Sequence, residues 1–210
     1  MSLTMQEFER GVAYWATTKW PKDFHNGFYG RLAEQNPRGQ FSEAWWQRFL
    51  PHLRAWKATR PARTAVLTRK ATESLETLRE TWARSCDPVA DRDIAEVDWA
   101  QVADFPAVVA EIKPDRSLLQ PVRSPVFTAK FCHFLLPAVF PVVDRAAMGL
   151  PFGATYRAHF EGARQEWATT PESTRQELQA ALESRIDAPL TAGYPLTNKV
   201  VELCLIGRRN

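Results

Sequence analysis

Asp144 is the residue whose surroundings in the sequence best suit chemistry. The four residues before it, Phe140–Val143, are apolar and stiffened by a proline, and Arg145 to Met148 can begin a helix after it. Asp is a preferred N-cap residue, so this carboxylate should stand at the mouth of that helix. A carboxylate with few polar neighbours can stabilise positive charge in a reaction, because charges interact more strongly where solvent is excluded. The alternative role is that of a helix cap alone, and the two roles are compatible.

Two further polar side chains interrupt an apolar helical pattern just before this turn. Lys130 and His133 lie three residues apart in the stretch Phe127–Leu136, so they share one side of the predicted helix, which Pro137 ends. We expect both to line the same cleft as the carboxylate and to contact phosphate or substrate. The alternative is that the lysine extends its amine to solvent and the histidine makes a local hydrogen bond.

This stretch resembles the helix-hairpin-helix DNA glycosylases of the adenine-glycosylase and endonuclease III type. The resemblance rests on Thr128-Ala129, the apolar run after it, and the Pro-x-x-Asp turn that ends at Asp144, and it covers about a seventh of the chain. In that family a glycine-rich hairpin leads into the Thr-Ala helix, and the aspartate is the catalytic carboxylate. The resemblance therefore implies that Asp144 is catalytic, and Lys130 on the preceding helix is our second catalytic candidate.

The chain departs from the family pattern in three places. The hairpin glycines, whose amides grip phosphate in the family, are replaced by the segment Val122-Arg123-Ser124-Pro125. The lysine of the lyase-type members would fall near Phe127 and not at Lys130, so we expect a monofunctional enzyme. The chain has three cysteines, which is too few for the four-cysteine iron–sulfur motif of some members. We expect no cofactor and no metal site.

Double-stranded DNA is the partner that the resemblance implies. The segment 31–80 holds ten Lys/Arg against five Glu, and such a block can meet phosphates. A solvated helix face is the alternative use of these charges. The DNA-binding candidates are Arg60 and Arg63 in this block, and Arg123, Ser124 and Thr128 where the family's hairpin touches the backbone.

Removal of a base requires that it leaves the stack and enters a pocket with stacking surfaces and polar groups. An aromatic, turn-rich stretch between Asp23 and Arg31 and a tryptophan cluster have this composition. A structural turn and an ordinary core are the alternatives for these two stretches. The substrate-binding candidates are His25, Asn26, Phe28, Tyr29, Trp45, Trp46 and His133.

The preferred function is therefore a monofunctional DNA glycosylase that leaves an abasic site. The chain looks similar to bacterial anti-phage glycosylases, which excise α-glucosyl-5-hydroxymethylcytosine from modified phage DNA, and this base is the substrate that the resemblance favours. A repair glycosylase for a damaged or alkylated base is the alternative within the class. Outside it, the chain would be a non-catalytic helical module that binds DNA or protein. A metal-dependent nuclease is disfavoured because no paired Asp, Glu or His spacing surrounds Asp144.

Composition and length set the broad class. The chain has 210 residues with 45% hydrophobic and 24% charged residues and a net charge of +3, which is ordinary globular usage. We expect one domain over residues 1–210, with lobes of roughly 1–115 and 116–210. The sequence contains no apolar run of membrane-spanning length and no signal peptide, so we expect a cytoplasmic protein, no membrane partner, and a monomer.

Helical periodicity recurs along the whole chain, and alternation typical of strands does not. The fold class is therefore all-α, and the resemblance implies two helical lobes around a cleft. The aromatic stretch at residues 23–31 is predicted as a turn. The main predicted helices are Met5–Lys19, one from Ser42 past Pro51, Thr64–Ala83, Phe127–Leu136, Tyr156–Trp167, Pro171–Ile186 and Leu196–Ile206.

Overall fold

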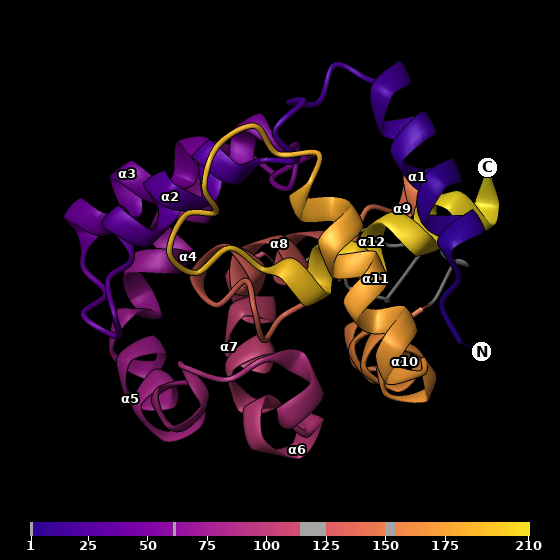
Figure 1. Ribbon diagram of the computed structural model, residues 1–210. Helices are drawn as coiled ribbons and strands as arrows, with labels where there is room; N and C mark the ends of the chain where they lie inside the picture. The colour runs from indigo at the N-terminus through magenta and orange to yellow at the C-terminus, as the bar shows by residue number, and fades with distance from the viewer. Residues whose placement is uncertain (1, 61, 114–124, 150–153) are drawn as a thin grey trace.

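The computed structural model describes residues 2–60, 62–113, 125–149 and 154–210, and these ranges contain helices and no strand. The all-α prediction is confirmed for this part of the chain (Figure 1). The helices are α1 (Met5–Thr17), α2 (Asn26–Gln35), α3 (Glu43–Ala55), α4 (Thr64–Glu73), α5 (Leu75–Ser85), η1 (Asp87–Val89), η2 (Ile94–Glu96), α6 (Trp99–Val102), α7 (Asp104–Ile112), α8 (Pro125–Leu135), α9 (Arg145–Met148), α10 (Tyr156–Thr169), α11 (Glu172–Glu183) and α12 (Leu196–Arg209).

The stretch predicted as a turn before Arg31 is largely helical. Asp23 accepts hydrogen bonds from the amides of His25 and Gly27, at 3.1 and 2.9 Å, and so starts α2 at Asn26. Phe24 and His25 have φ angles of 49° and 70°, which turn the chain sharply into the helix. The turn prediction was wrong because the glycines suggested irregular backbone. The Asp23 carboxylate, two residues before the N-cap His25, accepts a hydrogen bond from the amide of Gly27 in the first turn and supports the helix despite the low helix propensity of glycine.

The helix predicted from Thr64 to Ala83 is two helices that meet at Ser74. The Ser74 hydroxyl donates to the carbonyl of Lys70 at 2.8 Å, and its amide bonds the same carbonyl. A serine that bonds back to the preceding turn commonly bends or ends a helix. The change of direction lets α4 pack on α3 while α5 packs on α7.

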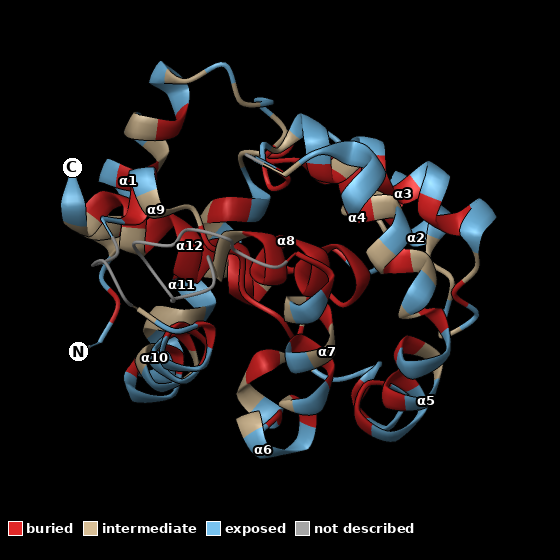
Figure 2. Cartoon of the chain, turned by 180° about the vertical axis from the view of Figure 1, so that it is seen from behind, coloured by how far each residue is buried: buried red, intermediate tan, exposed pale blue. Residues whose placement is uncertain are grey.

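Helix α8 lies at the centre of the molecule. Every residue from Phe127 to Leu135 is buried, so this helix is covered on all sides (Figure 2). Helices α2, α3, α7 and α10 pack around it, and Pro137 follows its end as predicted. A helix that is apolar all round is a core helix, and Lys130 and His133 are therefore interior groups.

One hydrophobic core runs through both predicted lobes. The same cluster of buried side chains includes Leu3 near the N-terminus, Phe131 in α8 and Cys204 in α12. The termini lie on the same side of the molecule, where α1 packs along α12 (Figure 1). Gly11 and Gly207 allow this approach, because a Cβ at either position would lie 2.0 Å or less from a backbone oxygen of the other helix.

Candidate functional site

Asp144 stands at the start of α9, as the sequence predicted. Its Oδ1 accepts hydrogen bonds from the amides of Ala146 and Ala147, both at 3.1 Å, while Oδ2 has no hydrogen-bond partner within the described ranges. The side chain is half-buried, and the three residues before it, 141–143, are buried. The carboxylate therefore caps its helix through one oxygen and keeps the other for a further interaction.

Lys130 lies close to this carboxylate but is an interior side chain. It is 7% exposed, its Nζ donates to the carbonyl of Trp56 at 2.8 Å, and it lies 5.7 Å from the Trp56 ring centroid. Burial lowers the pKa of Lys130, and the negative charge of Asp144 opposes that lowering. The alternative given for Lys130, in which its amine extends to solvent, is wrong, because the Trp56 carbonyl holds the amine inside.

A half-buried aromatic wall adjoins the start of α9. Tyr14, Trp20 and Trp56 pack against a small apolar cluster that includes Ala147 and Met148 of that helix. The ring centroids of Tyr14 and Trp20 are 6.1 Å apart. Partly exposed aromatic rings offer faces on which a planar base can stack. Tyr14 and Trp20 were missed from the sequence, since only the fold brings α1 and its following loop beside α9.

His25 carries a buried nitrogen without a partner among the described residues. The side chain is 8% exposed, and its Nδ1 accepts or donates no hydrogen bond in that part of the chain. Its ring lies 4.5 Å from that of Trp56 and 5.1 Å from that of Trp15, measured between centroids. Burial, with added repulsion from nearby cations such as Lys199, lowers the pKa of His25 to about 2, so the imidazole is neutral. A neutral imidazole can donate with one nitrogen and accept with the other.

A hydrogen-bonded chain crosses the core behind this wall. His133 donates from Nδ1 to the carbonyl of Phe140 at 2.6 Å, and its Nε2 accepts from the Tyr29 hydroxyl, also at 2.6 Å. The carbonyl can only accept, which fixes the tautomer. Burial lowers the pKa of His133 to about 3. The burial of His133 supports the alternative that the sequence analysis gave, a hydrogen bond and not a substrate contact, although the Tyr29 partner is 104 residues away in the chain. The hydrogen bonds tie α2 to the segment that leads to Asp144.

The remaining residues of the 23–31 stretch serve mainly to hold α2 in place. Asn26 is 3% exposed, and its side chain donates to the Pro189 carbonyl at 3.0 Å and accepts from the Thr191 amide at 2.9 Å. Phe28 stacks on Trp56 at 5.1 Å between centroids. Phe28 thus supports the aromatic wall from behind, and Asn26 anchors the loop before α12.

A buried ion pair that the sequence analysis missed lies on α12. Lys199 is 1% exposed and pairs with Glu202, and its ammonium lies 4.9 Å from the Trp15 ring and 5.5 Å from the Tyr29 ring. A lysine and a glutamate three apart look like a surface pair in sequence. The apolar residues that surround Lys199 and Glu202 in the sequence of α12 could have indicated that the pair is buried.

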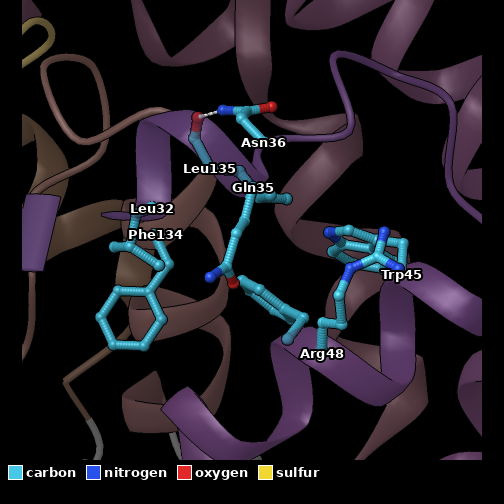
Figure 3. Close-up of a pocket in the computed structure, with 8 residues that line it drawn as sticks. Leu32, Gln35, Asn36, Trp45, Arg48, Phe134 and Leu135 are labelled. Atoms are coloured by element: carbon cyan, nitrogen blue, oxygen red, sulfur yellow. Dashed lines mark hydrogen bonds between the residues drawn. The ribbon is translucent and has the colours of Figure 1, made fainter. Parts of the chain in front are cut away.

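Trp45 and Trp46 belong to the core. They are 3% and 1% exposed and pack among Phe41, Phe49 and Phe131. The pocket beside Trp45 (Figure 3) holds a cavity of about 10 Å³, which is the space of one water molecule and far below that of a base. Their burial supports the alternative that the sequence analysis gave, which is an ordinary core, and we leave both out of the site.

The predicted DNA contacts have three different outcomes. Arg60 and Arg63 are exposed on the segment between α3 and α4. Thr128 lies in α8 and is 6% exposed, so its side chain packs in the interior and does not reach the surface. Arg123 and Ser124 lie outside the described residues.

Comparison of the chain with protein-family models, with curated proteins and with solved structures gives no match. Within the described ranges, no helix has both the length and the apolar content that a membrane span requires. The functional assignment therefore depends on the residues of the site.

Proposed function

We propose that this protein is a monofunctional DNA glycosylase in which Asp144 is the catalytic carboxylate. The observation that carries the proposal is the state of this side chain. One oxygen accepts from two amides, the other has no hydrogen-bond partner among the described residues, and a half-buried aromatic wall packs against the helix that Asp144 caps. A simple cap needs neither the buried approach through residues 141–143 nor the neighbouring buried cation of Lys130. Both features create the low-polarity surroundings in which a carboxylate acts most strongly.

The chemistry follows from the charge that forms on the sugar. As the bond between C1′ and the base nitrogen breaks, C1′ gains oxocarbenium character, and the Asp144 carboxylate stabilises that positive charge. A water molecule adds its oxygen to C1′ and its proton passes to the Asp144 carboxylate, which releases it to solvent. The departing base takes up one proton from solvent, so that one water molecule is consumed in total. The products are the free base and an abasic sugar. The extruded base stacks on the wall of Tyr14, Trp20 and Trp56, which offsets the cost of unstacking.

The substrate that we propose is α-glucosyl-5-hydroxymethylcytosine, which follows from the resemblance to anti-phage glycosylases. A damaged or alkylated base is the alternative substrate. Duplexes that carry normal, damaged and glucosylated bases, incubated with the protein and analysed by mass spectrometry for released bases, separate these choices. Strand breaks that form only after alkali would indicate base removal alone, whereas breaks before alkali would contradict a monofunctional enzyme.

Asp144→Asn is the decisive variant because it changes charge without removing the cap. Asparagine is as good an N-cap as aspartate, so its side-chain oxygen can still accept from the amides of Ala146 and Ala147. We expect loss of base release by at least about a hundredfold, with folding and DNA affinity retained. Asp93→Asn, which changes another capping aspartate, is the matched control and should keep full activity. Equal base release by the Asp144→Asn variant and the native protein would refute the assignment, and a protein that binds duplex without releasing any base would be a DNA-binding module.

A further inference from the structure

The segment that joins α3 to α4 concentrates positive charge. Residues 44–72 contain seven Lys/Arg and no Asp or Glu. Four of these cations lie within ten residues and are exposed: Arg54, Lys57, Arg60 and Arg63. We call the described residues of this segment, 54–60 and 62–63, the cationic turn. Like charges this close repel one another, so a cluster of four cations makes the folded state less stable than a surface of mixed charges would.

The side chains of the four cations of the cationic turn have no ion-pair or hydrogen-bond partner within the described ranges. Nearby cations on the following helices differ in this respect. Arg69 and Lys70 pair with Glu73, at 3.9 and 3.2 Å, and Arg79 pairs with Glu76 at 2.5 Å. The neighbouring helices thus pair these cations with carboxylates, whereas the turn presents its cations to solvent without a carboxylate partner in the described ranges. An external polyanion is the partner that such a surface fits.

Two buried ammonium groups hold the backbone of this turn from below. Lys113 donates from Nζ to the carbonyls of Ala58 and Arg60, at 3.1 and 2.7 Å. Lys130 donates to the carbonyl of Trp56 at 2.8 Å. Both lysines are buried, at 8% and 7% exposure. These hydrogen bonds to three carbonyls hold the turn, and they compensate both ammonium groups for the hydration that burial removes.

The backbone conformation of the turn also indicates a constrained element. Lys57 has a φ of 58°, in the left-handed region that residues with a side chain rarely adopt. The surrounding hydrogen bonds must hold it there, since such residues persist only where neighbours determine them. The cationic side chains therefore project from a fixed backbone and not from a free loop.

We propose that the cationic turn is a clamp for the phosphate backbone of DNA, held in place by Lys113 and Lys130. This inference rests on the proposed glycosylase function. Arg60 and Arg63 supply guanidinium groups, which match phosphate oxygens in pairs. Trp56 belongs to the same turn and to the aromatic wall beside α9. Phosphates bound on the turn would thus flank the nucleotide whose base lies on that wall. An acidic protein would not need this wall, so we favour nucleic acid.

In this proposal Lys130 is a positioning residue and not the attacking amine. Its Nζ is 2.8 Å from the Trp56 carbonyl and is covered by the core, so it acts on DNA through the turn. The negative charge of Asp144 favours the charged form of this ammonium, against the effect of burial on the Lys130 pKa.

The test is the salt dependence of duplex binding, measured by fluorescence anisotropy with a labelled duplex of about 20 base pairs between roughly 50 and 200 mM KCl. For Arg60→Gln with Arg63→Gln we expect weaker binding and a slope of log K against log salt that is smaller by about 1.8, for two lost phosphate contacts. Arg69→Gln with Arg79→Gln removes the same charge from paired positions and should leave the slope unchanged. Equal slopes for both double variants and the native protein would overturn the clamp, as would equal loss in both.

Two further measurements identify the ligand and the role of the buried lysine. Lys113→Met removes the donor to the carbonyls of Ala58 and Arg60 and should weaken duplex binding. Unchanged affinity in a folded variant would remove Lys113 from the clamp. Polyglutamate of matched charge should displace the duplex poorly, and tight polyglutamate binding would favour an acidic protein partner instead. Base release without a slope change refutes the clamp alone, and a slope change without any base release refutes the glycosylase alone.

Discussion

The contact between α1 and α12 gives a sharp prediction about stability. A Cβ at Gly207 would lie 1.8 Å from the backbone oxygen of Glu7, and ordinary contacts begin near 3.4 Å. The obstacle is backbone and not a side-chain tip, so the two helices must part by the difference between these distances. Their separation would loosen the packing of the buried side chains around Phe8 and Leu203 and the ion pair of Arg208 with Glu7.

Alanine has a helix propensity about 1 kcal/mol better than glycine, so Gly207→Ala would stabilise α12 if space allowed. Overpacking of a core typically costs about 1–3 kcal/mol and more where backbone must move. We therefore expect a net loss of at least about 2–3 kcal/mol, a large part of the roughly 5–15 kcal/mol that stabilises a domain. Gly11→Ala, which would meet the Leu203 oxygen at 2.0 Å, should behave alike.

Gly162→Ala is the matched control. Gly162 is exposed to solvent in the middle of α10, and a Cβ there would meet no described atom within 4 Å. The same substitution should raise the free energy of unfolding by about 0.5–1 kcal/mol. Urea unfolding followed by circular dichroism measures both variants. A Gly207→Ala variant as stable as the control variant would refute the close approach of the two helices.

Three more predictions concern buried polar groups. Burial lowers the pKa of His133 to about 3 and of His159 to about 4, below the ordinary 6.5, so unfolding takes up protons. Each neutral histidine contributes stability that is fully present above pH 6.5. Below pH 6.5 the free energy of unfolding falls by up to about 1.4 kcal/mol per pH unit for each histidine, until the pH reaches its folded-state pKa. The urea midpoint of His159→Gln should therefore fall less steeply with decreasing pH than that of the native protein. Tyr29→Phe strands the Nε2 of His133 and should cost about 1–3 kcal/mol in thermal unfolding, and an unchanged melting temperature would contradict the hydrogen bond. Lys199→Met leaves Glu202 buried without its partner and should cost about 3–5 kcal/mol, most of which a second change, Glu202→Leu, should recover in urea titrations.

Local patterns determined the class of the fold and the chemistry worth testing. The N-cap preference of aspartate and the helix-ending effect of proline act within a few residues, so the start of α9 at Arg145 and the end of α8 before Pro137 could be predicted. The same holds for the continuation of α3 through Pro51 and for α10, α11 and α12. These features depend on neighbours in the chain, which the sequence contains directly.

Tertiary structure alone decided which side chains surround Asp144. Tyr14 and Trp20 come from the first helix and its following loop, and the sequence offers no local reason to pair them with α9. The burial of Lys130 likewise depends on the Trp56 carbonyl, which is 74 residues away in the chain. A lysine lies inside only where a distant acceptor compensates for its lost hydration, and no local pattern records that acceptor. The carboxylate could therefore be predicted from sequence, whereas the wall and the buried cation beside it required the fold.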